Sequence, residues 1–334
     1  MQFAIIGAGS IGKRHIGNLL SLGIAPKDIH VFEPREDRRQ ECASRFGLSQ
    51  LYARFEDIGA VPVQAALLCS PTSEHIPQAA FYASRGSHLL IEKPLAHDLT
   101  GAEELRREVA AKGVRVLVAY CIRFSEHARK LKETVAAAPV GRPLYVHGEF
   151  SEYLPDWHPW EDYRTFYMAR SDQGGGSLLD QSHIMDLAHW CFGPVASVFG
   201  FNGRVSDLEV ESDDLAEMQV RFASGLVGTI HQDMFGRRHA KHLSVKCTDG
   251  DITWNMYDLS VSVFDVRART TETFAFGKDH QVMYLNELRH FLDLCAGQAD
   301  RPLCGLDEGI HGMRIIEAVR RSQASGRLEA VAGA

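Results

Sequence analysis

The chain has 334 residues, of which 45% are apolar, and its formal net charge at pH 7 is -7. Because a single hydrophobic core rarely serves more than about 250 residues, this length predicts two domains. The negative balance, without a long run of like charges, disfavours a nucleic acid or an anionic membrane surface as partner and favours a small molecule.

The first 121 residues alternate short apolar runs with helical stretches. Apolar runs of about four to eight residues separated by helices are typical of βαβ units. This segment therefore predicts an α/β fold, with a parallel sheet covered by helices on both faces. The expected strands are 3–6, 29–32, 65–69, 88–91 and 115–120.

From residue 122 onward the apolar runs become longer and alternate with polar residues, and turn signals separate them at hairpin-like distances. This pattern predicts an α+β domain, in which helices cover one face of an antiparallel sheet. The expected strands are 144–150, 215–222, 226–234, 242–247 and 259–266, and the expected helices are 125–138, 177–192, 281–297 and 309–326.

Seven cysteines are scattered along the chain. Their spacing predicts neither a disulfide framework nor a CxxC metal site, and we expect a reducing compartment. The N-terminal residues lack the basic segment of a secretory leader, and no apolar run approaches the roughly 18 residues of a membrane span. The sequence therefore predicts a soluble, cytoplasmic protein.

The sequence GAGSIG follows the first expected strand and opens a helix. Glycines at this place permit a tight turn and let the backbone approach a pyrophosphate at the helix N-terminus. The motif alone is weak, and a glycine turn without a ligand is the alternative, but its position between strand and helix favours a dinucleotide site. The candidate cofactor residues here are Gly7, Gly9, Ser10, Ile11 and Gly12.

Glu33 ends the second expected strand, 21 residues after Gly12, about the spacing at which an acid binds the adenosine ribose. Its carboxylate would repel a 2′-phosphate, so we expect NAD. Three arginines follow, and they could instead receive the phosphate of NADP or form an ordinary solvated helical turn; they are Arg35, Arg38 and Arg39.

Two further stretches lie where the carboxyl ends of parallel strands gather and where dinucleotides bind. CSPTSEH (69–75) makes Ser70, Pro71 and His75 candidate cofactor residues, although His75 could equally be a structural hydrogen-bonding residue. EKP places Glu92 and Lys93 at the end of the fourth strand, and this lysine could donate to a substrate oxygen or simply pair with Glu92 at the surface.

Taken together, several stretches resemble the Gfo/Idh/MocA oxidoreductases, named for glucose-fructose oxidoreductase and inositol dehydrogenase. They are GAGSIGKRH, CSPTSEH, EKP, the RF at Arg123 and Phe124, GGGSLLDQSHIMDLAHW and GLDEGIHGMRIIEAVRRS. The resemblance spans essentially the whole chain. It implies a Rossmann domain over 1–121, followed over 122–334 by a substrate-binding domain with a large, open, mostly antiparallel sheet that forms a homodimer or homotetramer interface.

The resemblance also implies an activity and its residues. Hydride would pass between a carbinol carbon of a sugar or cyclitol and nicotinamide. Lys93 matches the family's catalytic lysine, Asp180 and His183 fall in the motif of its aspartate and histidine, and Arg123 falls near the cofactor. The family's usual spacing is Asp-x3-His, whereas this chain has Asp-x2-His, which puts the position of the histidine in doubt.

On one helix, residues three apart share a face, so Asp180 and His183 would remain neighbours. His183 would then accept the hydroxyl proton, because imidazole changes protonation near neutral pH, while Asp180 orients it. A capping box from Ser177 to Asp180 could coexist with this role. We disfavour a metal bound by Asp180, His183 and Asp186, and expect no metal; Asp186 and His189 are interpreted as structural.

The stretch 151–176 is rich in aromatic residues and arginines. Aromatic faces pack on sugars and arginines bind anionic groups, so a substrate loop is one interpretation; an excursion held by aromatic packing, or an arm exchanged between subunits, is the other. Relatives with this pattern suggest an amino-sugar or nucleotide-sugar substrate. The candidate substrate residues are Tyr153, Trp157, Trp160, Tyr163, Arg164 and Arg170.

Two other functions fit the same resemblance. One is a regulator that senses NAD or a sugar without catalysis, which the presence of Lys93, Asp180 and His183 disfavours. The other is a glycosidase that uses tightly held NAD for transient oxidation. A dehydrogenase remains the main expectation.

Overall fold

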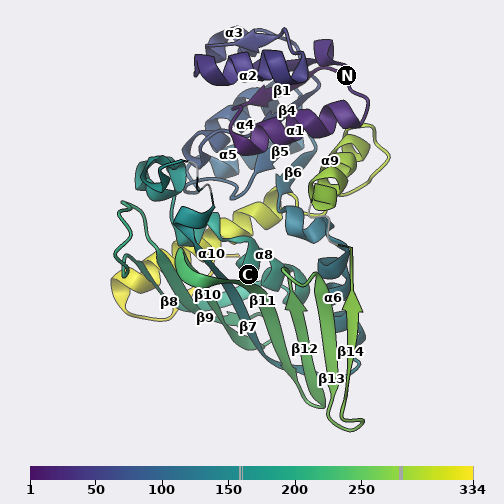
Figure 1. Ribbon diagram of the computed structural model, residues 1–334, viewed down its shortest axis with the longest axis vertical. Helices are drawn as coiled ribbons and strands as arrows, with labels where there is room; N and C mark the ends of the chain where they lie inside the picture. Colours follow the sequence, from purple (N-terminus) through teal and green to yellow (C-terminus); the bar gives the residue numbers. More distant parts are fainter. Residues whose placement is uncertain (158, 160, 278–280, 334) are drawn as a thin grey trace. The chain divides into compact units, whose positions relative to one another are not determined.

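A six-stranded parallel sheet, ordered β3-β2-β1-β4-β5-β6, carries the N-terminal glycine motif (Figure 1). The computed structural model describes residues 1–157, 159, 161–277 and 281–333, and its chain divides into two units. The first unit combines Met1–Cys121 with Gln281–Ile310, and the second combines Ile122–His280 with His311–Ala334.

The strands of the first unit are almost continuously apolar and buried on both faces, as a parallel sheet between helices requires. All five expected strands are present, and a two-residue edge strand too short to predict joins them. The strands are β1 (Phe3–Ile6), β2 (Ile29–Phe32), β3 (Leu51–Tyr52), β4 (Ala65–Leu68), β5 (His88–Glu92) and β6 (Val116–Ala119).

Helices follow these strands in turn, and one more arrives from late in the chain. They are α1 (Ser10–Ser21), α2 (Glu36–Phe46), α3 (Phe55–Gly59), α4 (His75–Ser84), α5 (Ala102–Lys112) and α9 (Gln281–Cys295). Short 3₁₀ turns lie at Pro26–Asp28, Thr72–Glu74 and Cys121–Phe124.

The return of α9 differs from the expected two-segment division, in which residues 281–310 belong to the second domain. In the structure α9 packs on α1, within the first unit. The chain after α9 is bound to the same unit, because Val118 donates its amide hydrogen to the Cys304 carbonyl at 2.9 Å and Arg106 pairs with Asp307 at 2.7 Å. These links are non-local, and the sequence pattern alone does not show them.

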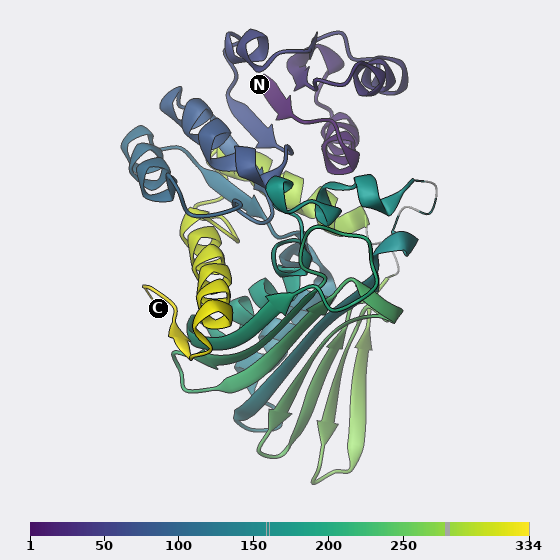
Figure 2. The same ribbon diagram turned by 90° about the vertical axis from the view of Figure 1, so that its left-hand side faces the viewer.

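The second unit is built on a nine-stranded sheet in the order β14-β13-β12-β11-β7-β10-β9-β8-β15 (Figure 2). Among its described strands, β7 and β10 pair in parallel, and the other neighbours are antiparallel. Its strands are β7 (Pro143–Tyr153), β8 (Val195–Gly203), β9 (Leu215–Phe222), β10 (Val227–Asp233), β11 (Phe235–Cys247), β12 (Gly250–Asn255), β13 (Ser260–Asp265), β14 (Thr270–Ala275) and β15 (Glu329–Ala330).

Helices cover one face of this sheet, and burial alternates along β9 as expected of a half-covered layer. α6 (Glu126–Ala137) packs on β12 and β13, and α8 (His183–Phe192) packs on β7 and β11. The expected mostly antiparallel sheet is confirmed; strands β8, β12, β14 and β15 were not predicted.

α10 (Leu306–Ser325) begins in the first unit and continues in the second. Within the part of the chain that the structure describes, none of the helices has the length and apolar character needed to cross a bilayer.

Candidate active site

The glycine turn after β1 has the geometry that a dinucleotide requires. Gly7 has a φ of +97°, and a Cβ there would lie 2.7 Å from the Cys69 carbonyl oxygen. A Cβ at Gly12 would lie 2.0 Å from the Gly7 oxygen. At Gly9, by contrast, the nearest atom is Nη1 of Arg38 at 3.9 Å, so a ligand can approach the backbone there. The turn therefore fits a pyrophosphate.

The start of α1 adds to this fit. Gly9 is the N-cap residue, and no described side chain caps the helix or places an acid in its first turn. The first amide hydrogens of a helix need acceptors and attract anions. A phosphate group of the cofactor would supply them.

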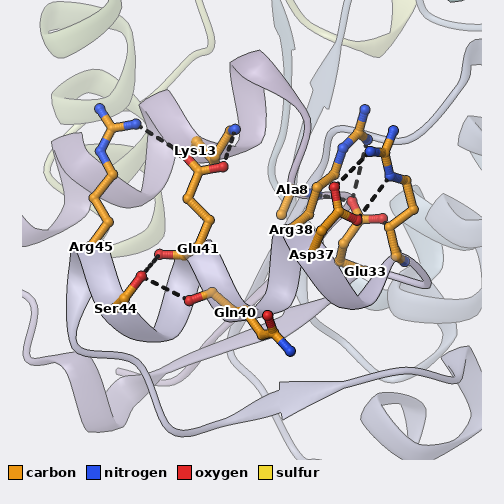
Figure 3. A network of polar contacts seen from close by, with 10 residues as sticks. Ala8, Lys13, Glu33, Asp37, Arg38, Gln40, Glu41, Ser44 and Arg45 are labelled. Atoms are coloured by element: carbon orange, nitrogen blue, oxygen red, sulfur yellow. Dashed lines mark hydrogen bonds and ion pairs between the residues drawn. The ribbon is translucent and has the colours of Figure 1, made fainter.

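Glu33 lies directly beside this turn. Its side chain is buried, with one carboxylate oxygen accepting from the Ala8 amide at 2.9 Å and the other from the Arg35 amide at 3.0 Å. Arg38 points toward it, with Nη1 3.6 Å from the Ala8-bound oxygen (Figure 3). The structure thus fixes a carboxylate at the end of β2, where an acid binds the ribose in NAD-dependent folds.

His75 connects two of the expected cofactor loops. One ring nitrogen lies 2.9 Å from the carbonyl oxygen of Ser70, and the other lies 3.2 and 3.3 Å from those of Pro94 and Leu95. The side chain is buried, and this burial lowers the pKa of His75, against the effect of the carbonyl oxygens. The geometry places His75 as a link between the loop after β4 and the loop after β5.

The loop after β5 begins with Glu92 and Lys93. Glu92 is bound to a histidine of α1: the His15 Nε2 and the Glu92 Oε1 are 2.7 Å apart. Its second oxygen accepts from the Lys93 backbone amide at 3.3 Å. Lys93 is half-buried, at the carboxyl end of the sheet where ligands of such folds bind.

In the second unit, the expected continuous helix over 177–192 is wrong. α7 (Ser177–Asp180) ends at Asp180 and α8 begins at His183. Between them the bonds Ser182 to Leu179 and Ile184 to Gln181 have a three-residue spacing, each 3.4 Å long. The fully buried Gln181 holds this turn, since its side-chain amide donates to the Asp233 carbonyl at 2.6 Å. Asp180 and His183 therefore flank a turn and do not share one helix face.

The capping box from Ser177 to Asp180, which the sequence left open, is not formed. Gly176, and not Ser177, is the N-cap residue of α7. A carboxylate distant in sequence supplies the cap, because Asp213 accepts from the Leu178 amide at 2.9 Å and from the Ser177 hydroxyl at 2.8 Å. The sequence could not reveal this partner.

Asp180 is buried and accepts a short hydrogen bond from the Tyr167 hydroxyl. Tyr167 lies in a 3₁₀ turn of the aromatic stretch and was not among the candidate residues. The ring of His183 lies parallel to that of Phe150, with 6.4 Å between centroids. Acid and imidazole groups are of the kinds that transfer protons to or from hydroxyl groups, and the catalytic roles of Asp180 and His183 stay predictions.

The second acid and the second histidine of this motif have structural partners. Asp186 forms a bidentate ion pair with Arg123, at 2.8 and 2.6 Å, and both side chains are buried. His189 stacks on His311 at 4.5 Å between ring centroids. The guanidinium of Arg123 is therefore engaged within the second unit, and its role toward the cofactor stays a prediction.

Residues of the stretch 151–176 pack in a small hydrophobic cluster together with Val210 and Met234 from later in the chain. Trp157 and Tyr163 pack against this cluster, and the Arg237 guanidinium stacks on Tyr153 at 3.6 Å. Trp160 lies outside the described residues. The buried members of the cluster are Leu154, Met168, Ala169, Val210 and Met234.

The two arginines of this stretch already have acidic partners. Arg164 lies 2.8 Å from both Asp162 and Glu209, and Arg170 lies 3.4 Å from Asp172. These neighbours raise the pKa of both guanidinium groups. An anionic substrate would have to compete with these carboxylates, so the substrate roles of both arginines stay predictions.

Comparison with known proteins identifies the chain. Residues 1–120 match the oxidoreductase family with an NAD-binding Rossmann fold, and residues 128–253 match the GFO/IDH/MocA C-terminal domain. The chain belongs to the Gfo/Idh/MocA oxidoreductases. The expected family, the Rossmann fold and the nicotinamide cofactor are thereby confirmed.

Relatives within this family include several dehydrogenases. A myo-inositol 2-dehydrogenase of Thermotoga maritima is 29% identical over 69% of this chain and 67% of its own. A scyllo-inositol 2-dehydrogenase (NAD(+)) of Bacillus subtilis is 24% identical over 91% of this chain and 88% of its own. A levoglucosan dehydrogenase solved with NADH superimposes with a TM-score of 0.87 at 20% identity, covering 99% of both chains, which shows the shared fold.

Proposed function

We propose that this protein is an NAD-dependent dehydrogenase acting on a carbinol carbon of a sugar or cyclitol. The observation that supports the proposal is a turn between α7 and α8, flanked by the acid Asp180 and the imidazole His183, in a chain with an NAD-binding domain. Named relatives act on inositols and on levoglucosan, and their activities support this substrate class.

The cofactor would be held by the first unit. The glycine turn and the start of α1 would bind the pyrophosphate, and Glu33 the adenosine ribose. The loops that carry Ser70, Pro71 and Glu92 would line the remainder of the cofactor. When bound, NAD⁺ supplies the hydride acceptor.

The protein's own residues would manage the oxygen and the proton. Lys93 would donate a hydrogen bond to the reacting oxygen and stabilise developing negative charge there. His183 would accept the hydroxyl proton, and Asp180, held by Tyr167, would orient the imidazole or the substrate.

The aromatic stretch 151–176 would contribute substrate contacts. Among its candidate residues, Tyr153 is the last residue of β7. An amino-sugar or nucleotide-sugar substrate is part of this proposal; a structural neighbour from Bordetella pertussis was solved with NADH and UDP-GlcNAcA. We further propose a cytoplasmic homo-oligomer assembled through the nine-stranded sheet. A monomeric mass by light scattering would contradict the oligomer.

The test is a screen of inositols, aldoses and nucleotide sugars, with NAD⁺ and the purified protein, followed by nicotinamide absorbance. A dehydrogenase produces NADH with at least one compound. Lys93→Met should keep NAD binding and lower kcat by about 10²-fold or more, the range for a lost transition-state contact. Normal turnover by this variant would exclude the assignment.

The same screen separates the two other functions. A sensor would bind NAD or a sugar but would show no turnover with any compound of the screen. A glycosidase would release a leaving group from a glycoside with no net change in NADH. Preference for NADP over NAD in kcat/KM would contradict the role of Glu33.

A further inference from the structure

A fully buried acid lies in the first unit. Glu287 of α9 is 0% exposed, and neither of its carboxylate oxygens has a hydrogen-bond partner among the described residues. One oxygen of Glu287, one oxygen of Glu92 and one ring nitrogen of His15 all lie within 4.8 Å of one another. These three side chains come from α9, β5 and α1.

The ionic state of this trio follows from its geometry. His15 and Glu92 are in direct contact at 2.7 Å, so a positive imidazolium there would balance one carboxylate only. A second buried carboxylate beside the first is strongly disfavoured in a low-dielectric interior. Burial and the neighbouring Glu92 accordingly raise the pKa of Glu287 well above its usual range.

A neutral Glu287 carries an O–H donor, and a buried donor needs an acceptor. The acceptor within the trio is a carboxylate oxygen of Glu92, which lies within 4.8 Å of an oxygen of Glu287.

Other ionisable groups face the trio from the surrounding elements. Burial raises the pKa of Cys69 and Cys121, and both acids of the trio add to it, so these thiols stay neutral. The pKa of Tyr284 is raised, chiefly by Cys121 and by burial, and Arg14 stacks over this ring at 4.2 Å. Lys93 acts on the Cys121 thiol from the loop after β5.

We propose that His15, Glu92 and Glu287 form a buried proton-sharing site, in which Glu287 is the neutral acid and donates to Glu92. Glu92 in turn accepts from the Lys93 backbone amide. Glu287 is therefore a positioning residue, which acts through Glu92 on the loop that carries the proposed catalytic lysine. The site's protonation does not depend on which substrate the enzyme uses.

The direct test is infrared difference spectroscopy of the full-length protein at pH 8. The wild-type protein should show the carbonyl band of a protonated carboxyl group, Glu287→Gln should lack it, and Glu92→Gln is the matched control at the neighbouring acid. Absence of the band in the wild type, or its persistence in Glu287→Gln, would overturn the proposal. So would a stoichiometric metal ion that is bound by the wild type and lost from Glu287→Gln.

A second measurement tests the same proposal without the Glu287→Gln variant, in case that variant does not fold. In wild-type protein labelled with ¹³C at the glutamate carboxyl carbon, one resonance should keep the chemical shift of a protonated acid at pH 8. If every glutamate resonance has the shift of an ionised carboxylate, the proposal is wrong. Neither measurement requires a substrate, so both are independent of the proposed function.

Steady-state kinetics test the positioning role of Glu287. Of the three measurements, this one alone rests on the proposed function. Glu287→Gln retains an N–H donor for Glu92, whereas Glu287→Leu has none. We expect kcat to fall about tenfold in the leucine variant, with KM for NAD little changed, and to be largely retained in the glutamine variant. Equal loss in both variants, with an unchanged pH profile, would reduce Glu287 to a packing residue.

Discussion

The hydrogen bond from Tyr167 to Asp180 is the contact through which the aromatic stretch reaches the proposed catalytic acid. Asp180 is buried, whereas Tyr167 is 39% exposed, so the phenol joins a solvent-facing turn to an internal carboxylate. A carboxylate held by a phenol is fixed in one orientation, which suits a residue that must direct an imidazole or a hydroxyl group.

Tyr167→Phe should therefore lower kcat by about tenfold, since one hydrogen bond to a charged group is lost while the ring is kept. Steady-state kinetics with the substrate found in the screen would measure this. Tyr163→Phe is the control from the same stretch, because the Tyr163 hydroxyl accepts from the Glu209 amide at 3.2 Å and, among the described residues, has no hydrogen bond to Asp180. Equal effects of the two substitutions would contradict a special role for Tyr167.

Residue identity could be predicted from the sequence only in part. Lys93, Asp180 and His183 stand in recognisable motifs, and Glu33 stands at a recognisable spacing. Tyr167 stands in no motif; three short 3₁₀ turns between Tyr163 and Gln173 decide which aromatic side chain meets Asp180. Such turns depend on long-range packing, which a sequence pattern does not encode.

At the scale of the element, the start of α7 depends on one glycine and one distant acid. Gly176 has a φ of +113°, and a Cβ there would lie 2.2 Å from the Asp213 carboxylate that caps the helix. Gly193, after α8, also has a positive φ of +86°, but no atom lies within 4 Å of its Cβ position among the described residues. The two glycines thus share a positive φ, which would strain a residue with a side chain, and differ in the capping contact.

We expect Gly193→Ala to lower the free energy of unfolding by about 1–3 kcal/mol, the cost of this backbone region for a residue with a side chain. Gly176→Ala should lose about 1–2 kcal/mol more, because the cap is displaced as well. It should also reduce activity, since α7 ends at Asp180. Urea unfolding of both variants measures the difference, and an equal loss would mean that Asp213 adapts without cost.

The break between α7 and α8 shows why element boundaries resist prediction. The run from Ser177 to Phe192 has helical spacing throughout, and it contains neither proline nor glycine. The interruption comes from Gln181, whose side chain binds the end of β10. A tertiary hydrogen bond therefore overrides a local pattern that correctly predicts helix on both sides.

At the scale of the whole molecule, the two kinds of sheet follow from the sequence, but the path of the chain does not. The change from short apolar runs to long alternating ones near residue 121 coincides with the end of the first N-terminal segment. The helix α9 has an ordinary amphipathic pattern, and its local sequence does not indicate that it packs on α1. Glu287 and its buried acid–imidazole site were missed for the same reason.

Two histidines of the second unit should shape the pH dependence of unfolding in opposite directions. His231 of β10 lies 2.8 Å from Asp233 and 2.6 Å from Glu217, and these hydrogen bonds raise its pKa to about 10. His311 of α10 is buried beside His189, and burial lowers its pKa to about 4. Both have an ordinary value of 6.5 in the unfolded chain.

The signs follow from proton linkage. The stabilisation from His231 is complete below pH 6.5 and is lost as the pH rises through about 10, because the folded state holds its proton longer. The stabilisation from a neutral His311 is complete above pH 6.5 and is lost as the pH falls toward 4, because the unfolded chain takes up the proton first. The combined contribution of these two histidines to stability is therefore expected to be greatest near pH 6.5.

Stability declines on both sides of pH 6.5, as an alkaline limb and an acid limb of the pH profile, and each can be removed by a separate substitution. His231→Gln should flatten the decline in unfolding free energy between pH 6.5 and about 10, with a loss of about 1.5–3 kcal/mol at pH 6, the usual contribution of hydrogen bonds to a charged group. His311→Gln should flatten the decline below pH 6.5 and leave the alkaline limb intact. Urea titrations across this pH range measure both limbs. An alkaline decline that survives His231→Gln would show that other groups control it, and that the His231–Asp233 pair contributes no net stability.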